Sequence, residues 1–288
     1  MKNCVVMLLA ISCVLGFMPG TSLAQEFEDG YNSNSVNPIH ESHQLYKVRV
    51  WRRIDLREKM NKPFFSANRE ITKFFIESVK NGTLNPYTND SLTQRMTKEQ
   101  FMENLKIPGM GGGGADDMFG GSGGGGFGDT GGGFGEEEEE EESATAQAYY
   151  FAPKDASVLE IKEDVIFDKH RGRVYYKIQS VKMILPPENF PETGLLKEVA
   201  TFRYKDLHRL FMENPDKAIW VNNYNDAEHR NLAEAFELRL FDGRIVKYSN
   251  PDNEYIIDME DGDPRSALLR SMEYEYELLE KEHMLWEY

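Results

Sequence analysis

Arg69-Glu-Ile-Thr-Lys-Phe-Phe-Ile-Glu-Ser-Val-Lys-Asn-Gly82-Thr-Leu-Asn-Pro-Tyr87 is a stretch that this chain repeats, without gaps, as Arg230-Asn-Leu-Ala-Glu-Ala-Phe-Glu-Leu-Arg-Leu-Phe-Asp-Gly243-Arg-Ile-Val-Lys-Tyr248. In both copies apolar residues recur at helical spacing, and a Gly and then a Tyr follow. The pattern predicts a helix that the Arg opens, followed by a strand. Both Gly residues fit the left-handed position after a helix, where a side chain is disfavoured.

A second pair of similar segments lies upstream of each copy. Trp51-Arg-Arg-Ile-Asp-Leu56 and Phe202-Arg-Tyr-Lys-Asp-Leu207 both read aromatic-Arg-x-x-Asp-Leu. The later pair is separated by a longer connection, which we place around residues 214–217. We interpret the chain as two divergent copies of a strand-helix-strand unit. Chance similarity is the alternative, because a helix, a Gly stop and a Tyr are common.

The N-terminus predicts a secretory signal peptide over residues 1–24. Met1-Lys-Asn3 is a short basic start, the run from Cys4 to Phe17 is apolar but too short to cross a membrane, and small residues precede Gln25. Lipid attachment at Cys13 is a weaker alternative. Both cysteines of the chain lie in this segment, so the mature protein has neither a disulfide nor a catalytic thiol. The formal net charge of −16 argues against nucleic acid or anionic lipid as a partner.

Residues 108–147 predict a disordered Gly/Glu-rich linker. Isolated residues interrupt glycines from Gly109 to Gly135, and seven glutamates follow from Glu136 to Glu142. Such a composition forms no compact core. The tract contains G-x-G spacings but no Lys-Ser/Thr of a phosphate loop, and no strand precedes it. A solvated acidic spacer is favoured over a loose calcium site.

The remaining sequence predicts an α+β fold in two parts. Residues 25–107 hold an N-terminal arm and the first repeat unit, and residues 148–288 hold the second, larger unit with a C-terminal helix that Asp263-Pro264 opens. A β-hairpin is predicted within the second part, with its turn at His170-Arg-Gly-Arg173. The first part is too small to bury much surface alone, so we expect the two units to share one core.

The densest positive region of this acidic chain follows the predicted strand over residues 45–56. We expect it either to pair with carboxylates inside the fold or between copies, which we favour, or to bind an acidic partner. His40 and His43 have a spacing that could bind metal, but the sequence shows no third ligand nearby. The candidate interface residues are Arg49, Trp51, Arg52, Arg53, Arg57 and Lys59.

Several long and unusual strings extend across both parts of the chain. They are Val50-Trp-Arg-Arg-Ile-Asp-Leu-Arg-Glu-Lys59, Ile161-Lys-Glu-Asp164, Asn225-Asp-Ala-Glu228, Phe236-Glu-Leu-Arg239 and Glu282-His-Met-Leu-Trp-Glu-Tyr288. These strings resemble the GldN/PorN family of gliding-motility and type IX secretion proteins from Bacteroidota. The Gly/Glu tract lies outside the family pattern.

This resemblance implies a non-enzymatic subunit of a periplasmic ring associated with the outer membrane. Its implied partners are a GldK/PorK-like outer-membrane lipoprotein and the periplasmic part of a GldM/PorM-like motor protein. It implies no cofactor and no catalytic residue. The alternatives are a periplasmic hydrolase, for which the sequence shows no Ser, His and Asp set in a recognisable context, and a calcium-binding envelope protein, which depends on Glu136 to Glu142 alone.

Overall fold

The computed structural model describes residues 27–28, 30–107, 150–190 and 195–286. The predicted signal peptide over residues 1–24 lies outside the described residues. So does the whole predicted linker at 108–147, including its Gly and Glu tract. The structure is mixed α and β, and it is built on one antiparallel sheet in the order β12-β3-β7-β8-β9-β6. These strands are β3 (Gln44–Asp55), β6 (Pro86–Tyr87), β7 (Val158–Asp168), β8 (Arg173–Leu185), β9 (Lys197–Arg203) and β12 (Arg244–Tyr248).

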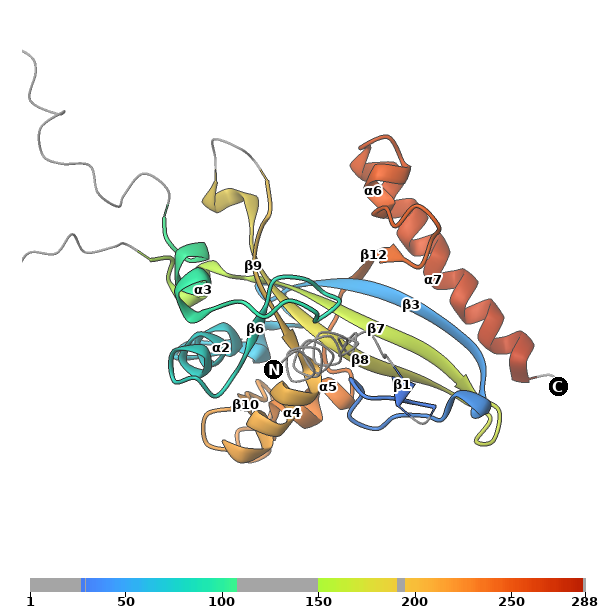
Figure 1. Ribbon diagram of the computed structural model, residues 1–288, viewed down its shortest axis with the longest axis horizontal. Coiled ribbons are helices and arrows are strands. Elements are labelled where there is room, and N and C mark those ends of the chain that lie inside the picture. The colour runs from blue at the N-terminus through green and yellow to red at the C-terminus, as the bar shows by residue number, and fades with distance from the viewer. Residues whose placement is uncertain (1–26, 29, 108–149, 191–194, 287–288) are drawn as a thin grey trace, which may run out of the picture.

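Helices gather around this sheet, and Figure 1 shows α2 and α4 near one end of it and α7 beside the other. The helices are α2 (Ile71–Lys80), α3 (Lys98–Asn104), α4 (Tyr204–Glu213), α5 (Leu232–Glu237), α6 (Ile256–Met259) and α7 (Pro264–Trp286). The described residues also form three two-stranded ribbons: β1 (Phe27–Glu28) with β2 (Tyr31–Asn32), β4 (Phe65–Ser66) with β5 (Arg69–Glu70), and β10 (Ile219–Trp220) with β11 (Arg230–Asn231).

The predicted hairpin is the centre of the sheet. β7 and β8 pair from Val158 opposite Ile184 to Asp168 opposite Arg173. β3, from the first part of the chain, lies against the other edge of β7 and runs antiparallel to it along its whole length. The two parts of the chain therefore share one sheet, and every residue of β7 is buried within it.

The main core also joins the two parts. It lies between the sheet and α2, α4 and α5, and its largest members are phenylalanines. Phe75 packs on Phe202 with ring centroids 5.1 Å apart, Phe211 stacks on Phe236 at 6.1 Å, and Phe64 contacts Phe236 at 5.2 Å. Each buried side chain of this size contributes about 2–3 kcal/mol relative to an exposed one. Neither part therefore has a complete core of its own.

A smaller core fixes α7 to the edge of the sheet. Tyr274 of α7 stacks on Tyr248 of β12 with ring centroids 4.1 Å apart. One turn earlier, Ser271 Oγ donates a hydrogen bond to the Ile245 carbonyl at 2.7 Å. This side of α7 is thus held by both an apolar and a polar contact.

The helices of the repeated stretches begin two residues later than predicted. Arg69 and Arg230 do not open them but lie in β5 and β11, from which α2 and α5 directly follow. Gly82 has a φ of +73°, as expected after α2. The same expectation is wrong for Gly243, because Arg239 takes the left-handed position after α5 with a φ of +53°.

Gly243 is required for a different reason. A Cβ atom at this position would lie 2.7 Å from the Arg53 carbonyl oxygen and 2.8 Å from Ile54 Cγ1. The absence of a side chain therefore allows the chain to approach β3 closely just where β12 begins.

Candidate interface on the charged strands

The predicted basic stripe is divided between the two faces of the sheet. Because side chains alternate along a strand, Arg49, Trp51 and Arg53 lie on one face of β3 and Arg52 lies on the other. Arg57 and Lys59 follow the end of β3. The six residues therefore do not form one continuous surface.

On the first face the stripe pairs with buried carboxylates of β7. Arg49 Nε lies 2.7 Å from Asp164 Oδ1, and Lys47 Nζ lies 3.3 Å from Asp164 Oδ2. Arg53 Nη2 lies 3.0 Å from Glu160 Oε2. Asp164 and Glu160 are both buried, so these pairs connect β3 to the central strand in a medium that screens charge weakly.

Arg52 makes the corresponding connection on the opposite face. Its Nε lies 3.3 Å from Glu163 Oε1, and its Nη1 donates to Glu275 of α7 at 2.7 Å and to the Gly243 carbonyl at 2.5 Å. Burial alone would lower the pKa of Arg52, but the Glu163 and Glu275 carboxylates outweigh it and raise the pKa above its ordinary value. Arg239 also donates to Glu163, so one buried carboxylate holds two guanidinium groups.

Trp51 lies between two ammonium groups. Lys162 Nζ is 5.6 Å and Lys247 Nζ 4.9 Å from its ring, which are cation–π distances. Its indole nitrogen donates to Asp90 at 2.9 Å. Burial alone would raise the pKa of Asp90, but the Lys162 ammonium and the Trp51 hydrogen bond outweigh it and lower the pKa. Trp51 is buried and so presents little surface to a partner.

Arg57 and Lys59 are the accessible members of the stripe. Arg57 Nη2 lies 2.9 Å from Asp55 Oδ2 and its Nη1 lies 2.5 Å from Glu188 Oε2, while Lys59 is exposed. The favoured interpretation, pairing within the fold, thus agrees with the contacts of the four arginines. That the six residues contribute to a subunit interface stays a prediction.

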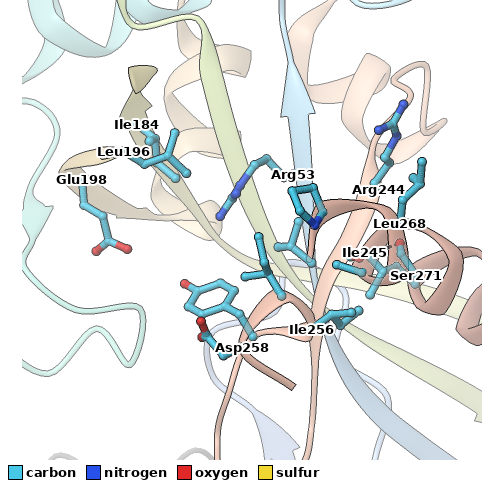
Figure 2. A pocket seen from close by; sticks show the side chains of 15 residues that line it. Arg53, Ile184, Leu196, Glu198, Arg244, Ile245, Ile256, Asp258, Leu268 and Ser271 are labelled. Carbon is cyan, nitrogen blue, oxygen red and sulfur yellow. Dashed lines mark hydrogen bonds between the residues drawn. The ribbon is translucent and has the colours of Figure 1, made fainter. Parts of the chain in front are cut away.

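A cavity of 540 Å³ adjoins the stripe at Arg53. Figure 2 shows Arg53 between Ile184 and Leu196 on one side and Arg244 and Leu268 on the other. Tyr255, also in its wall, donates to Glu160 at 3.3 Å. Burial, together with the Glu160 carboxylate, raises the pKa of Tyr255 to about 12, so this phenol stays protonated at neutral pH. The apolar walls suit binding better than proton transfer.

The histidines of the predicted arm lie close to a third one. The ring of His43 is 5.6 Å from that of His40 and 4.1 Å from that of His170 in the β7–β8 turn. His40 Nδ1 lies 2.7 Å from Ser42 Oγ. Among the described residues, no three His, Cys, Asp or Glu side chains are placed to hold a metal ion.

Sequence reasoning missed the acidic partners of the stripe. These partners are Glu160, Glu163 and Asp164 of β7. Charged residues in a strand are normally interpreted as solvent-exposed when only the strand's own sequence is considered. The sequence predicted β7 only as one strand of a hairpin and gave no sign that it is buried between two neighbouring strands, where charges need partners. Each of these three residues has a partner on β3, which precedes β7 by some hundred positions, and no local pattern identifies these partners.

No helix in the described parts of the chain combines the length and apolarity that a membrane span requires. The family model described as "Gliding motility associated protein GldN" matches residues 39–287, which includes the sheet, the charged strands and α7. No curated protein matches the chain.

Proposed function

The chain belongs to the GldN family of gliding-motility-associated proteins, and from this premise we propose that it is a non-enzymatic structural subunit of the gliding-motility and type IX secretion machinery. In this proposal it works in the periplasm as part of a ring at the outer membrane. Its partners are further copies of itself, a GldK/PorK-like lipoprotein and the periplasmic part of a GldM/PorM-like motor protein.

The family match over residues 39–287 carries this proposal. The charged strands add physical support, because a force-bearing subunit benefits from strands that are cross-linked by ion pairs as well as by backbone hydrogen bonds. β3 and β7 are connected on both faces of the sheet, by Arg49 and Arg53 on one face and by Arg52 on the other.

The test is to capture the tagged chain from an outer-membrane extract of its own organism after mild cross-linking. Negative-stain imaging and mass spectrometry then identify the particles and the proteins that co-elute. We expect large closed rings that contain a lipoprotein. A clean monomer, under conditions that preserve other envelope complexes, would contradict the proposal.

For the predicted interface we propose Arg57 and Lys59 as its accessible part. Charge reversal at Arg49, Arg52 or Arg53 would place a second carboxylate beside a buried one and so perturb folding as well as assembly. Charge reversal at both Arg57 and Lys59 spares these buried pairs and should weaken ring assembly.

The matched control for this change is Arg209→Glu with Lys217→Glu, which reverses one exposed Arg and one exposed Lys elsewhere. Both variants should show wild-type circular dichroism and thermal melts. Rings that assemble equally well from both would remove Arg57 and Lys59 from the interface.

We also propose that the two similar units are divergent copies related by an approximate twofold axis. The strand order is β12-β3-β7-β8-β9-β6. If β3 is exchanged with β9, β6 with β12 and β7 with β8, the result is the same order read from the opposite edge of the sheet. Each copied helix directly follows a two-residue strand, β5 or β11. The last strand of each unit pairs with the first strand of the other, which supports a shared rather than a separate fold for each copy.

A further inference from the structure

α7 has a second apolar face that nothing in the described structure covers. Its inner side is seated on β12 through Ser271 and Tyr274, which are buried. On its outer side large apolar residues have between 47% and 67% of their surface exposed. These outer residues are Leu269, Met272, Tyr276 and Leu279, and Trp286 extends them near the helix end.

The spacing of this outer stripe is that of a helix-pairing seam. From Leu269 to Leu279 the apolar positions are separated by three, four and three residues. This alternation keeps the side chains in line along one side of a helix, as in the a and d positions of a coiled coil. At 23 residues, α7 is about 35 Å long and can hold a partner helix of several turns.

The stripe also borders a groove. Met272, Tyr276 and Leu279 form one wall of a 450 Å³ cavity, and Tyr176 and Arg239 are in the facing part of its lining. Arg239 lies 4.1 Å from the centre of the Tyr176 ring and is bound to Glu163, so this wall is rigidly held. Exposed apolar surface next to a shaped groove is typical of a protein-binding site.

The charges beside the stripe identify the kind of partner. Glutamates flank the stripe on both sides. Glu273 and Glu280 lie on the side that is farther from the sheet, and Glu275 and Glu282 lie on the side that is nearer to it. Arg270 partly neutralises Glu273, and Arg52 partly neutralises Glu275. The only Lys or Arg between residues 273 and 282 is Lys281, so the flanks remain acidic.

A second copy of α7 is a poor match for this surface. In either orientation, two such helices paired through their stripes would place glutamates opposite glutamates, which is repulsive. The same charges disfavour binding to an anionic membrane surface. A helix with basic flanks would instead form ion pairs along both sides of the stripe.

We propose that the outer stripe of α7 binds an amphipathic helix of another protein, one whose apolar seam is flanked by Lys or Arg. The contact is of the helix-in-groove kind, with apolar side chains entering between Met272, Tyr276 and Leu279 and basic side chains meeting Glu273 and Glu280. The proposal does not depend on ring formation.

The probe is a synthetic helical peptide of three heptads, with Leu at the seam and Lys at every flanking position, which keeps the peptide from pairing with itself. The control is the same peptide with Glu in place of each Lys. Fluorescence anisotropy measures the binding of each to the purified full chain. We expect the Lys peptide to bind in a salt-dependent manner and the Glu peptide to bind at least about tenfold more weakly.

The double variant Met272→Gln with Tyr276→Gln should bind the Lys peptide about tenfold or more weakly than the wild type, since apolar anchors dominate such contacts. Met284→Gln is the matched control, because Met284 is 55% exposed on the same helix but lies off the stripe. Glu273→Lys with Glu280→Lys should reverse the preference between the two peptides. Circular dichroism must stay unchanged in every variant.

Three results would overturn the proposal. The first is absence of binding by the Lys peptide, or binding that the stripe variants do not weaken. The second is self-association of the chain in sedimentation that Met272→Gln with Tyr276→Gln abolishes, which would assign the stripe to a second copy. The third is stripe-dependent binding to anionic vesicles in preference to the Lys peptide.

Discussion

Glu163 offers the sharpest test of how the sheet is held together. Its carboxylate is fully buried and accepts hydrogen bonds from Arg52 Nε at 3.3 Å and from Arg239 Nη2 at 3.2 Å. These two arginines come from different parts of the fold. Glu163→Gln keeps the shape but removes the charge, leaving both guanidinium groups without their buried counter-ion. Breaking such a pair from one side costs about 3–5 kcal/mol.

We expect the lower end of this range, because both arginines keep other contacts. Arg52 retains Glu275 and the Gly243 carbonyl, and Arg239 retains the Tyr176 ring. The expected loss of about 3 kcal/mol in the free energy of unfolding corresponds to a fall in Tm of roughly 6–12 °C for a protein of this size. Urea and thermal unfolding followed by circular dichroism measure both quantities.

Glu275→Gln is the matched control. It removes a carboxylate from the same Arg52, but one whose side chain is 43% exposed, so we expect a loss of at most about 1 kcal/mol. A double-mutant cycle of Glu163→Gln with Arg239→Gln measures the coupling of the buried pair directly. Equal losses from Glu163→Gln and Glu275→Gln, each below about 1 kcal/mol, would refute the view that burial strengthens these pairs.

The two repeated glycines should respond differently to substitution. Gly82→Ala should lower the free energy of unfolding by about 1–2 kcal/mol because of the positive φ at this position, and Gly82→Asn should be tolerated. Gly243→Ala should lower it by about 2–3 kcal/mol because of a steric clash, and Gly243→Asn should not be tolerated. Urea unfolding of the four variants decides this, and an equally tolerated Gly243→Asn would contradict it. Asp90→Asn should lower stability by about 1 kcal/mol at pH 7. Folding lowers the pKa of Asp90, so its contribution to the free energy of unfolding is present above the ordinary aspartate pKa and is lost as the pH falls through the folded value. In urea unfolding, the difference in stability between Asp90→Asn and the wild type should therefore shrink below about pH 4. Chains 25–107 and 148–288 should each be unfolded alone and form the native sheet when co-expressed, because β3 pairs with strands of the other part on both of its edges; a cooperative melt from either chain alone would disprove this.

Elements with a strong local signal could be predicted from the sequence. β3, α2, the β7–β8 hairpin and the start of α7 at Pro264 all lie close to their predicted positions. The sequence Thr97-Lys-Glu-Gln100 has the form of a capping box, and this capping box begins α3. In each case the deciding interactions join residues a few positions apart, which periodicity and capping motifs record.

The candidate site could be predicted only in part. The basic residues of β3 are visible in the sequence, but their distribution over two faces became clear only from the sheet. The difference between Gly82 and Gly243 could not be predicted either, because one depends on its own φ and the other on the approach of β3.

By itself the sequence determined the mixed α and β character, the acidic balance, the main helices and strands, and the family to which the chain belongs. Only the tertiary structure decided that β3 lies between β7 and β12, which carboxylate neutralises each arginine, and which side of α7 remains exposed. The physical reason is that helices and hairpins arise from interactions between near neighbours in the chain. Burial and ion pairing depend instead on strands that meet only when distant parts of the chain fold together.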